Sequence, residues 1–386
     1  MIRYLTAGES HGPALSGIIE GMPANLPIDL DLVNYELHRR QQGFGRGGRM
    51  KLESDRIEVL SGIRFKKTLG SPIGFILRNK DWENWTEIMS QSEGSPGREI
   101  TRPRPGHADL SGALKYHFED MRNVLERSSA RETAMRVAVG GFVKQLLTYF
   151  DMHIFSHVLQ IGPVKARAEV IQEIVKNNDI NERADRSPVR CLDAEAEKEM
   201  VEFIKETKSK GDTVGGIIQI IIRNVPPGLG SYVHWDRKLD ARLAAALMSV
   251  QAVKGVEVGL GFKGARFLGS QFHDEMFWQD HSVVRRSNHA GGIEGGMSNG
   301  QDIVLQIFMK PIPTLMKPLH SVDVKSKENI SAHKERSDVT AVPACSVIAE
   351  AVVAPVVANA FMEKFGGDTV DDMAEALKRY KKRIRF

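Results

Sequence analysis

The chain has 386 residues, 41% of them hydrophobic, which is enough to bury a large core in one domain or in two or three smaller ones. Its 53 basic and 49 acidic residues leave a net charge of +4, too small to indicate a nucleic-acid partner unless the basic side chains cluster on one face. The two cysteines, Cys191 and Cys345, lie far apart and outside any Cys-x-x-Cys pattern. Their placement argues against a disulfide framework and a structural zinc site, and favours a reducing cytoplasm.

Neither export nor membrane insertion is indicated. Residues 1–12 lack the apolar stretch of a signal peptide, and the longest apolar region, residues 347–362, is interrupted by Glu350 and is too short to span a bilayer. We therefore expect a cytoplasmic protein with no membrane partner.

Two segments, residues 15–22 and 214–225, are rich in Ile and Val and end at proline-containing turns, which predicts buried strands. Each leads through a Pro/Gly loop into a helix that opens near Asp29 or Asp236. A weak repeat of strand, loop and helix is therefore expected.

Two core helices are predicted. Apolar side chains recur at helical spacing over residues 130–150, and Ser129 and Glu132 form a capping box in which the serine oxygen accepts a backbone N–H and the glutamate reaches back. Residues 236–253 form the second helix, with Gly255 as its C-terminal stop. Its inward positions are Leu239, Leu243, Leu247 and Val250.

Three further segments carry no predicted chemistry. Residues 165–210 are polar and charged, which predicts a solvated peripheral excursion. A helix begins near Thr369 and ends in a run of Lys and Arg, which we interpret as a complement to the helix dipole or a solvated face. Residues 259–264 match Gly-x-Gly-x-x-Gly, but the following residues do not resemble a helix start, so we expect a glycine-rich strand connection and no Rossmann domain.

Four segments combine Gly, Ser, His and Arg in ways that packing does not require. In residues 8–12, His11 lies between small residues that let a ligand approach, although a lone histidine is more often structural. Residues 39–50 place four arginines among four glycines. This composition is typical of a mobile lid that closes over an anion, and it also fits a solvated loop or an RNA-binding loop. Phe44 is its only aromatic residue, so a stacking platform for RNA is not evident.

The other two segments are residues 102–107 and 127–131. Two prolines in the first hold its arginines and His107 in a fixed relation, and the second joins a capped helix start, where free N–H groups favour an anion. Residues 310–314 and 336–338 belong with these segments, although an Asp beside an Arg, such as Asp338, is usually an ordinary ion pair or a loop cap.

Together these segments resemble the chorismate synthase family along nearly the whole chain. Three signature regions are recognisable: residues 8–12 continuing to 23, residues 126–133, and residues 336–338 continuing to 350. The arginine loop and residues 102–107, 251–255 and 291–300 resemble family segments in the same order. Small departures occur at Ser337, where some relatives have histidine, and at residues 312–313.

The resemblance implies a single α+β domain over residues 1–386, a sandwich of antiparallel β-sheets and helices that assembles as a homotetramer. It implies a lyase that eliminates phosphate in trans-1,4 fashion from 5-enolpyruvylshikimate 3-phosphate, giving chorismate for aromatic amino acid biosynthesis through the shikimate pathway. Reduced FMN is required although the reaction is redox-neutral. NADPH enters only indirectly, through flavin reduction, and an external flavin reductase is a possible partner.

Residue roles follow from the same resemblance. His11 would protonate the departing phosphate, His107 would support the reduced flavin, and Asp338 would relay a proton taken up at flavin N5. Two carboxylates and a phosphate on the substrate explain the arginines. The implied substrate-binding residues are Arg40, Arg46, Arg49, Arg104, Arg131 and Arg336. The implied cofactor-binding residues are Arg127, Ser128, Ser129, Gln251, Ala252, Gly295, Lys310, Pro311, Ile312, Pro313, Thr314 and Arg336.

Two alternatives remain at this point. An RNA- or polyanion-binding protein would use the arginine loop and the basic C-terminus, with steeply salt-dependent affinity and no turnover. An NADPH-dependent flavin reductase would pass hydride to free FMN.

Overall fold

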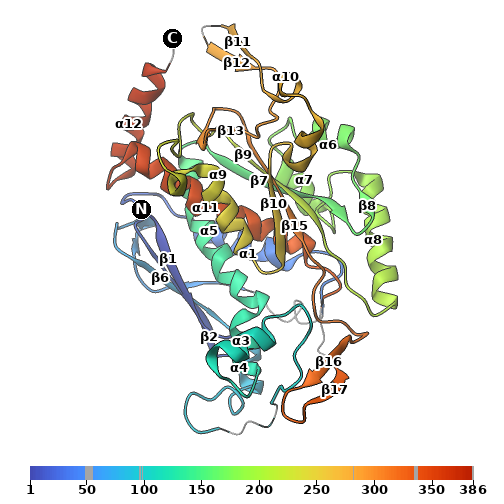
Figure 1. Ribbon diagram of the computed structural model, residues 1–386. Helices are drawn as coiled ribbons and strands as arrows, with labels where there is room; N and C mark the ends of the chain where they lie inside the picture. The colour runs from blue at the N-terminus through green and yellow to red at the C-terminus, as the bar shows by residue number, and fades with distance from the viewer. Residues whose placement is uncertain (48–54, 95–96, 98, 281, 334–337, 385–386) are drawn as a thin grey trace.

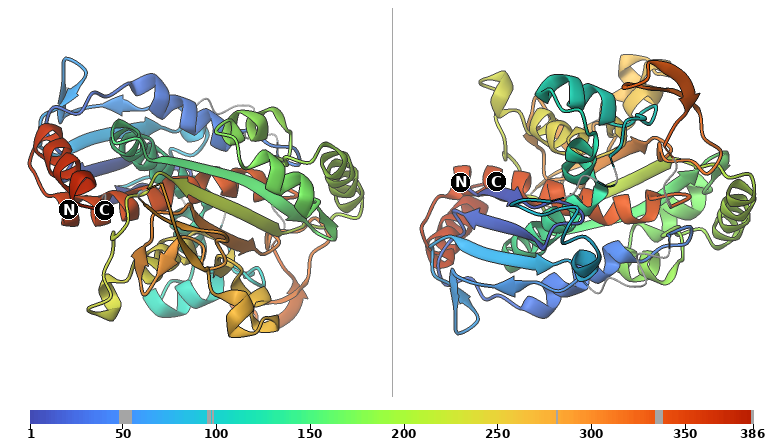
Figure 2. Two further views of the ribbon diagram at one scale, coloured as in Figure 1. Left: turned by 90° about the horizontal axis from the view of Figure 1, so that it is seen from above. Right: turned by 90° about the horizontal axis from the view of Figure 1, so that it is seen from below.

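The computed structural model describes residues 1–386 except 48–54, 95–96, 98, 281, 334–337 and 385–386. Two antiparallel sheets enclose a layer of helices (Figures 1 and 2), which confirms the expected α+β sandwich. The first sheet consists, in spatial order, of β1 (Arg3–Ala7), β2 (Ala14–Glu20), β6 (Ile73–Arg78) and β3 (Glu58–Val59). The second consists of β10 (Val253–Val258), β15 (Ile303–Met309), β9 (Gly216–Arg223), β7 (His153–Ile161) and β8 (Val164–Lys165).

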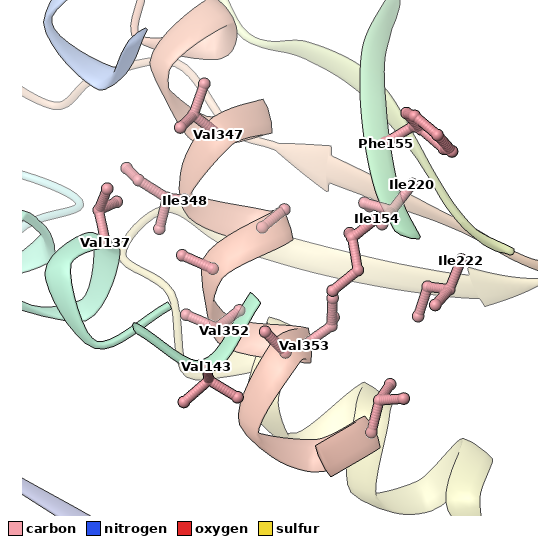
Figure 3. Close-up of a cluster of buried hydrophobic side chains, with 14 of the residues drawn as sticks. Val137, Val143, Ile154, Phe155, Ile220, Ile222, Val347, Ile348, Val352 and Val353 are labelled. Carbon is pink, nitrogen blue, oxygen red and sulfur yellow. The ribbon is translucent and has the colours of Figure 1, made fainter. Parts of the chain in front are cut away.

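The helices of the middle layer are α1 (Leu30–Gln41), α5 (Thr133–Tyr149), α9 (Leu239–Met248) and α11 (Val342–Phe365). Helix α5 packs on β2 and α11, and α11 packs in turn on β7 and β9. Figure 3 shows α11 between its two neighbours, with Val137 and Val143 of α5 on one side and Ile154 and Ile222 of the second sheet on the other. Burial of each such side chain contributes about 1.5–3 kcal/mol, so the packed middle layer anchors both sheets.

The strand–loop–helix repeat is confirmed. Strand β2 leads through residues 23–27 into α1, and β9 leads through residues 226–230 into α9. Asp29 caps α1 by accepting a hydrogen bond from the backbone N–H of Asp31 at 2.9 Å. The repeat therefore supplies one strand to each sheet and two helices to the layer between them.

The second predicted core helix is shorter than expected. Helix α9 begins at Leu239, after a 3₁₀ turn (η3, Trp235–Arg237), and ends at Met248, and its predicted inward leucines are fully buried. Gly255 does not stop the helix, because it lies within β10 and pairs with Phe308 of β15. The apolar pattern continues past residue 248 because the next segment is a core strand rather than more helix.

The first core helix is preceded by a 3₁₀ turn (η2, Ala130–Glu132), and only half of its predicted capping box forms. The hydroxyl of Ser129 accepts a hydrogen bond from the backbone N–H of Arg131 at 3.3 Å. The Glu132 carboxylate instead accepts from the side chains of Arg136 and Gln251, since both are long donors within its reach. The glutamate thus serves a tertiary contact rather than the helix cap.

Helix α11 corrects the expectation that the apolar C-terminal region is too short for a membrane span. It has 24 residues, and by length and composition alone it could cross a bilayer. However, 83% of its most apolar window is buried inside the protein, between α5 and the second sheet. Its apolar character on all sides is that of a core helix.

The segment 165–210 forms α6 (Ala168–Ile174), α7 (Ile180–Arg186) and α8 (Ala194–Ser209) on the outside of the second sheet (Figure 1). Met200 and Ile204 of α8 are fully buried and continuous with the main core. Helix α12 (Val370–Arg383) begins after Thr369, as predicted. Residues 259–264 follow β10 directly and run into a 3₁₀ turn (η4, Gly261–Arg266), and β10 pairs antiparallel with β15, so the segment follows a strand and opens no Rossmann helix, as expected.

The remaining elements are short. They are β4 (Ile63–Arg64), β5 (Lys67–Thr68), η1 (Lys80–Asn84), α3 (Asp109–Tyr116), α4 (Arg122–Ser128), α10 (Gly269–Phe272), β11 (Met276–Gln279), β12 (Ser282–Arg285), β13 (Ile293–Glu294), β14 (Met297–Ser298), β16 (His320–Asp323) and β17 (Glu328–Ser331). Figure 1 shows α3, α4 and the β16–β17 hairpin at one end of the molecule, beyond the N-terminal end of α5. That end holds most of the predicted site.

Candidate functional site

His11 follows the first strand and is held by the end of α4. Its Nδ1 lies 2.9 Å and 3.0 Å from the two carboxylate oxygens of Glu126, and its backbone N–H donates to Glu126 Oε2 at 2.9 Å. The imidazole stacks on the indole of Trp85, with ring centroids 3.9 Å apart. Burial alone would raise the pKa of Glu126, but hydrogen bonds from His11 and the charge of Arg122 lower it overall. The histidine is therefore fixed against an ionised carboxylate.

Arg131 lies beside the His11 segment. The amide of Asn79 connects the two, because it donates to the backbone oxygen of Gly12 and accepts from Arg131 Nε at 3.0 Å. Arg131 Nη1 donates to both oxygens of the buried Asp55, at 2.7 Å and 2.8 Å. The hydroxyl of Ser129 also donates to that of Ser10 at 3.2 Å. Residues 8–12 and 127–131 are thus in contact, as they must be if both bind one ligand.

Arg40 and Arg46 bring the arginine-rich segment to the same place. Arg40 is the next-to-last residue of α1 and is buried rather than part of a loop; it donates from Nε to Thr133 Oγ1 at 2.9 Å. Burial lowers the pKa of Arg40 to about 9, and the nearby positive charges of Arg46 and Arg131 add to this effect, whereas Asp55 opposes it. These neighbouring like charges favour the arrival of an anion.

Asp338 joins this cluster from the segment before α11. Its Oδ2 lies 3.1 Å from Arg46 Nε, and its Oδ1 accepts the backbone N–H of Gly47 at 2.6 Å. The predicted arginines Arg49 and Arg336, together with Ser337, lie outside the described residues. Asp338 therefore ties the glycine-rich loop to the start of α11.

Arg104, His107 and Asp109 form a second cluster at the start of α3. Arg104 donates to both oxygens of Asp109, at 2.8 Å and 3.0 Å, and to Thr314 Oγ1 at 2.9 Å. The Nδ1 of His107 lies 2.5 Å from Asp109 Oδ1. Burial would raise the pKa of Asp109, but its hydrogen bonds with His107 and Arg104 place it far below its usual range. The carboxylate orients both the guanidinium of Arg104 and the imidazole of His107.

The two clusters are linked through the predicted cofactor residues. The ammonium group of Lys310 donates to the backbone oxygen of Gly106, and its backbone N–H donates to that of Ala252 at 2.9 Å. The neighbouring Gln251 donates to Glu132 at 3.1 Å, one residue from Arg131. Helix α3 also packs directly on α4, which carries Glu126. His107 and His11 are thus held by adjoining elements.

The other predicted cofactor residues are distributed unevenly. Arg127 donates to the backbone oxygens of Thr6 and Gly8, at 2.9 Å and 3.1 Å, so it secures the end of β1. Ser128 is the last residue of α4, and Ser129 caps the turn before α5. Residues 310–314 follow β15, where the backbone oxygen of Ile312 accepts from Thr213 at 2.7 Å and Pro311 and Pro313 separate Lys310, Ile312 and Thr314.

Gly295 is the predicted residue that the fold places apart. It lies in the β13–β14 turn, beside Gly296, whose backbone oxygen accepts the N–H of Leu239 at the start of α9. Gln251 lies beyond the opposite end of α9. Ten residues at 1.5 Å each put about 15 Å of helix between the two positions.

Several residues of the site, including Asn79, Glu126, Asp109, Asp55 and Trp85, were not assigned a role from the sequence. Glu126 lies within a signature region, and Asp109 lies two residues from His107, so proximity could have suggested both. Asp55 and Trp85 follow no motif. Only the folded chain shows that they contact Arg131 and His11.

The fold and site together define an α+β protein in which two sheets and a helical layer hold a cluster of arginines and histidines suited to a small polyanion. Comparison with known proteins agrees with this class. The chorismate synthase family model matches residues 2–362, and the chain belongs to the chorismate synthase family.

Members of this family match the chain along nearly its full length and theirs. The chorismate synthase of Alkaliphilus metalliredigens is 56% identical over 98% of this chain and 99% of its own, and that of Bacillus cytotoxicus is 52% identical over all of both. A crystal structure of a chorismate synthase is similar with a TM-score of 0.81 and 41% identity, covering 100% of this chain and 98% of that one.

Proposed function

We propose that this protein converts 5-enolpyruvylshikimate 3-phosphate to chorismate by trans-1,4 elimination of phosphate. Family membership over the whole chain supports the reaction. The observation that carries the site is the meeting of Arg40, Arg46 and Arg131 beside His11, because a substrate with two carboxylates and a phosphate needs several fixed cations and a proton donor.

The arginines would bind and orient the substrate, and the roles of Arg49, Arg104 and Arg336 rest on the resemblance. His11, held by Glu126, would donate a proton to the departing phosphate oxygen. His107, held by Asp109, would place positive charge or a proton beside the cofactor. Asp338, whose Oδ2 lies 3.1 Å from Arg46 Nε, would relay the proton taken up at flavin N5.

The residues present fit reduced FMN. The side-chain oxygen Oε1 of Gln251 is buried and has no hydrogen-bond partner among the described residues, which suits a ligand N–H. Ala252 has a positive φ of 70° and follows Gln251 directly. With these, Arg127, Ser128, Ser129 and residues 310–314 would hold the cofactor, whereas Gly295 is proposed on the resemblance alone. The chemistry that reduced FMN would supply at this site is the transient loan of an electron, with no net oxidation.

The proposal also includes the assembly of the protein, its cellular compartment and its partners. We infer a single catalytic domain in a homotetramer in the cytoplasm, without nucleic-acid or membrane partners. NADPH would act only indirectly, through an external flavin reductase.

The test is an anaerobic assay of phosphate and chorismate formation from 5-enolpyruvylshikimate 3-phosphate. Turnover should require reduced FMN, stop with oxidised FMN alone, and proceed without stoichiometric NADPH consumption. Folded protein that releases no phosphate under these conditions would reject the proposal. Stoichiometric NADPH oxidation without substrate would favour the flavin reductase, and salt-dependent RNA binding without turnover would favour the polyanion-binding protein.

A further inference from the structure

Glu126 forms an unusually complete contact with His11. Its side chain is 1% exposed and that of His11 is 10% exposed, so neither group exchanges its partner for water easily. One carboxylate oxygen accepts the backbone N–H of His11 at 2.9 Å, and both lie within 3.0 Å of Nδ1. Arg122 donates to the same carboxylate at 3.3 Å.

Trp85 restricts the ring further. Its indole stacks on the imidazole at a centroid distance of 3.9 Å and an interplanar angle of 26°, and it is anchored by a hydrogen bond from its Nε1 to Asp81 at 2.9 Å. Arg122 lies 5.2 Å from the indole centroid. The imidazole is therefore stacked on an anchored ring, and its Nδ1 is held by Glu126.

The hydrogen-bonding capacities of these groups determine the tautomer. An ionised carboxylate can only accept, so Nδ1 must carry a proton whenever it is bonded to Glu126. The other nitrogen, Nε2, is then the one that takes up and releases the exchangeable proton. In water a neutral imidazole can carry its proton on either nitrogen, whereas here the Glu126 carboxylate keeps it on Nδ1.

We propose that Glu126 is a positioning residue for the reaction: it keeps a proton on Nδ1 of His11, while Trp85 fixes the ring plane. The imidazolium then gives its Nε2 proton to the departing phosphate and is left as the neutral Nδ1–H tautomer. The kinetic part of this inference rests on the proposed function of His11. The tautomer itself does not, because it can be measured without substrate.

Glu126→Gln is a sharp test because the amide cannot reproduce the carboxylate. With its oxygen against the backbone N–H of His11, the amide places its NH₂ group at the other oxygen position, 2.9 Å from Nδ1. The NH₂ group can only donate, and it does so to an Nδ1 that carries no proton, so the amide no longer requires a protonated Nδ1 and the Nε2–H tautomer becomes populated. The matched control is Asp274→Asn, which also alters a buried carboxylate that accepts two backbone N–H groups, from His289 and Ala290.

The experiment is ¹⁵N NMR of histidine-labelled full-length protein near neutral pH, with His11→Gln used to assign the resonance. The wild-type protein and Asp274→Asn should show a protonated Nδ1, and Glu126→Gln should show a fraction of His11 in which Nδ1 carries no proton and Nε2 does. In the anaerobic assay, Glu126→Gln should lower kcat roughly ten- to hundredfold with little change in KM, because the proton donor rather than ground-state binding is affected. Trp85→Phe should retain most activity and Trp85→Leu should not.

A wild-type His11 whose Nδ1 carries no proton, or a Glu126→Gln variant whose Nδ1 stays as fully protonated as in the wild type, would overturn the positioning role. So would a Glu126→Gln variant that loses stability but keeps full turnover per folded molecule. If the tautomer switches as expected while the wild-type protein itself releases no phosphate, the proposed function fails and the positioning role stands.

Discussion

Arg39 and Glu350 form a two-point ion pair across the middle layer of the fold. The two terminal nitrogens of the guanidinium donate to the two carboxylate oxygens at 2.9 Å and 3.0 Å, although 311 residues separate them in sequence. Glu350 is fully buried in α11 and also accepts from Lys144 and Ser156. Arg39 precedes Arg40 at the end of α1, so this pair holds the base of the arginine-rich segment.

Glu350→Ala should destabilise the protein by about 3–5 kcal/mol, because it removes a fully buried carboxylate shared by Arg39, Lys144 and Arg190. The carboxylates that remain beside Arg39, those of Glu36 and Asp185, are more exposed. The free energy of unfolding in urea measures this destabilisation. Glu363→Ala is the matched control in the same helix, since Glu363 pairs with Arg242 in a more exposed position, and it should cost about 0–1 kcal/mol. Equal effects of the two substitutions would contradict the assigned role of Glu350.

An anion should stabilise the arginine cluster in the absence of other ligands. Burial and neighbouring cations lower the pKa of Arg40, so binding of inorganic phosphate relieves repulsion in the folded state. Phosphate at about 100 times its Kd should add about 2.7 kcal/mol to the free energy of unfolding. Arg40→Leu should abolish this gain, whereas Lys381→Gln on the exposed face of α12 should preserve it. A gain that persists in Arg40→Leu would place the anion elsewhere.

Acid should destabilise the protein through Asp109, Glu126 and Glu350. In each, burial raises the pKa, but paired cations or hydrogen bonds lower it overall below its unfolded value of about 3.9 or 4.3. The folded state therefore holds these carboxylates ionised, and their contribution to stability is present above those unfolded values and lost as the pH falls below them. Urea midpoints measured from pH 7 to pH 3 should decrease, and Glu350→Gln should flatten the decrease.

Removal of the proposed proton-transfer groups should affect turnover rather than folding. His11→Ala and Asp338→Ala should each lower kcat by roughly 10²- to 10⁴-fold in the anaerobic phosphate-release assay. Circular dichroism and urea unfolding check that the fold is kept. Loss of stability with unchanged activity per folded molecule would show that these side chains are structural.

Gly140 should be required where α5 crosses α11. A Cβ added there would lie 2.4 Å from the Cβ and 2.5 Å from the Cα of Ala351, so the two helices would have to separate. Gly140→Ala should cost about 1–3 kcal/mol, although alanine is the better helix former. Gly141→Ala is the internal comparison, because its Cβ would meet Val33 at 3.1 Å, and it should cost much less.

The sequence alone determined the elements and the family. The strands containing Leu15 and Ile220, the start of α1 at Asp29 and the helix after Thr369 follow from local apolar patterns and capping chemistry, which need no distant partner. Motifs with His11, Arg131 and Asp338 indicated polyanion chemistry because their residue types are unusual together.

Tertiary structure decided what each of these groups contacts. The capping box at Glu132 and the helix stop at Gly255 failed because a distant donor and a neighbouring strand offered stronger contacts than the local ones. Local patterns likewise carry no information on the pairing of Arg131 with Asp55, or of His11 with Trp85 and Glu126. Such pairings form only when the two sheets pack against the helical layer. Burial of a charged or polar group is costly unless it is hydrogen-bonded, so these groups pair with whichever residues the fold brings next to them.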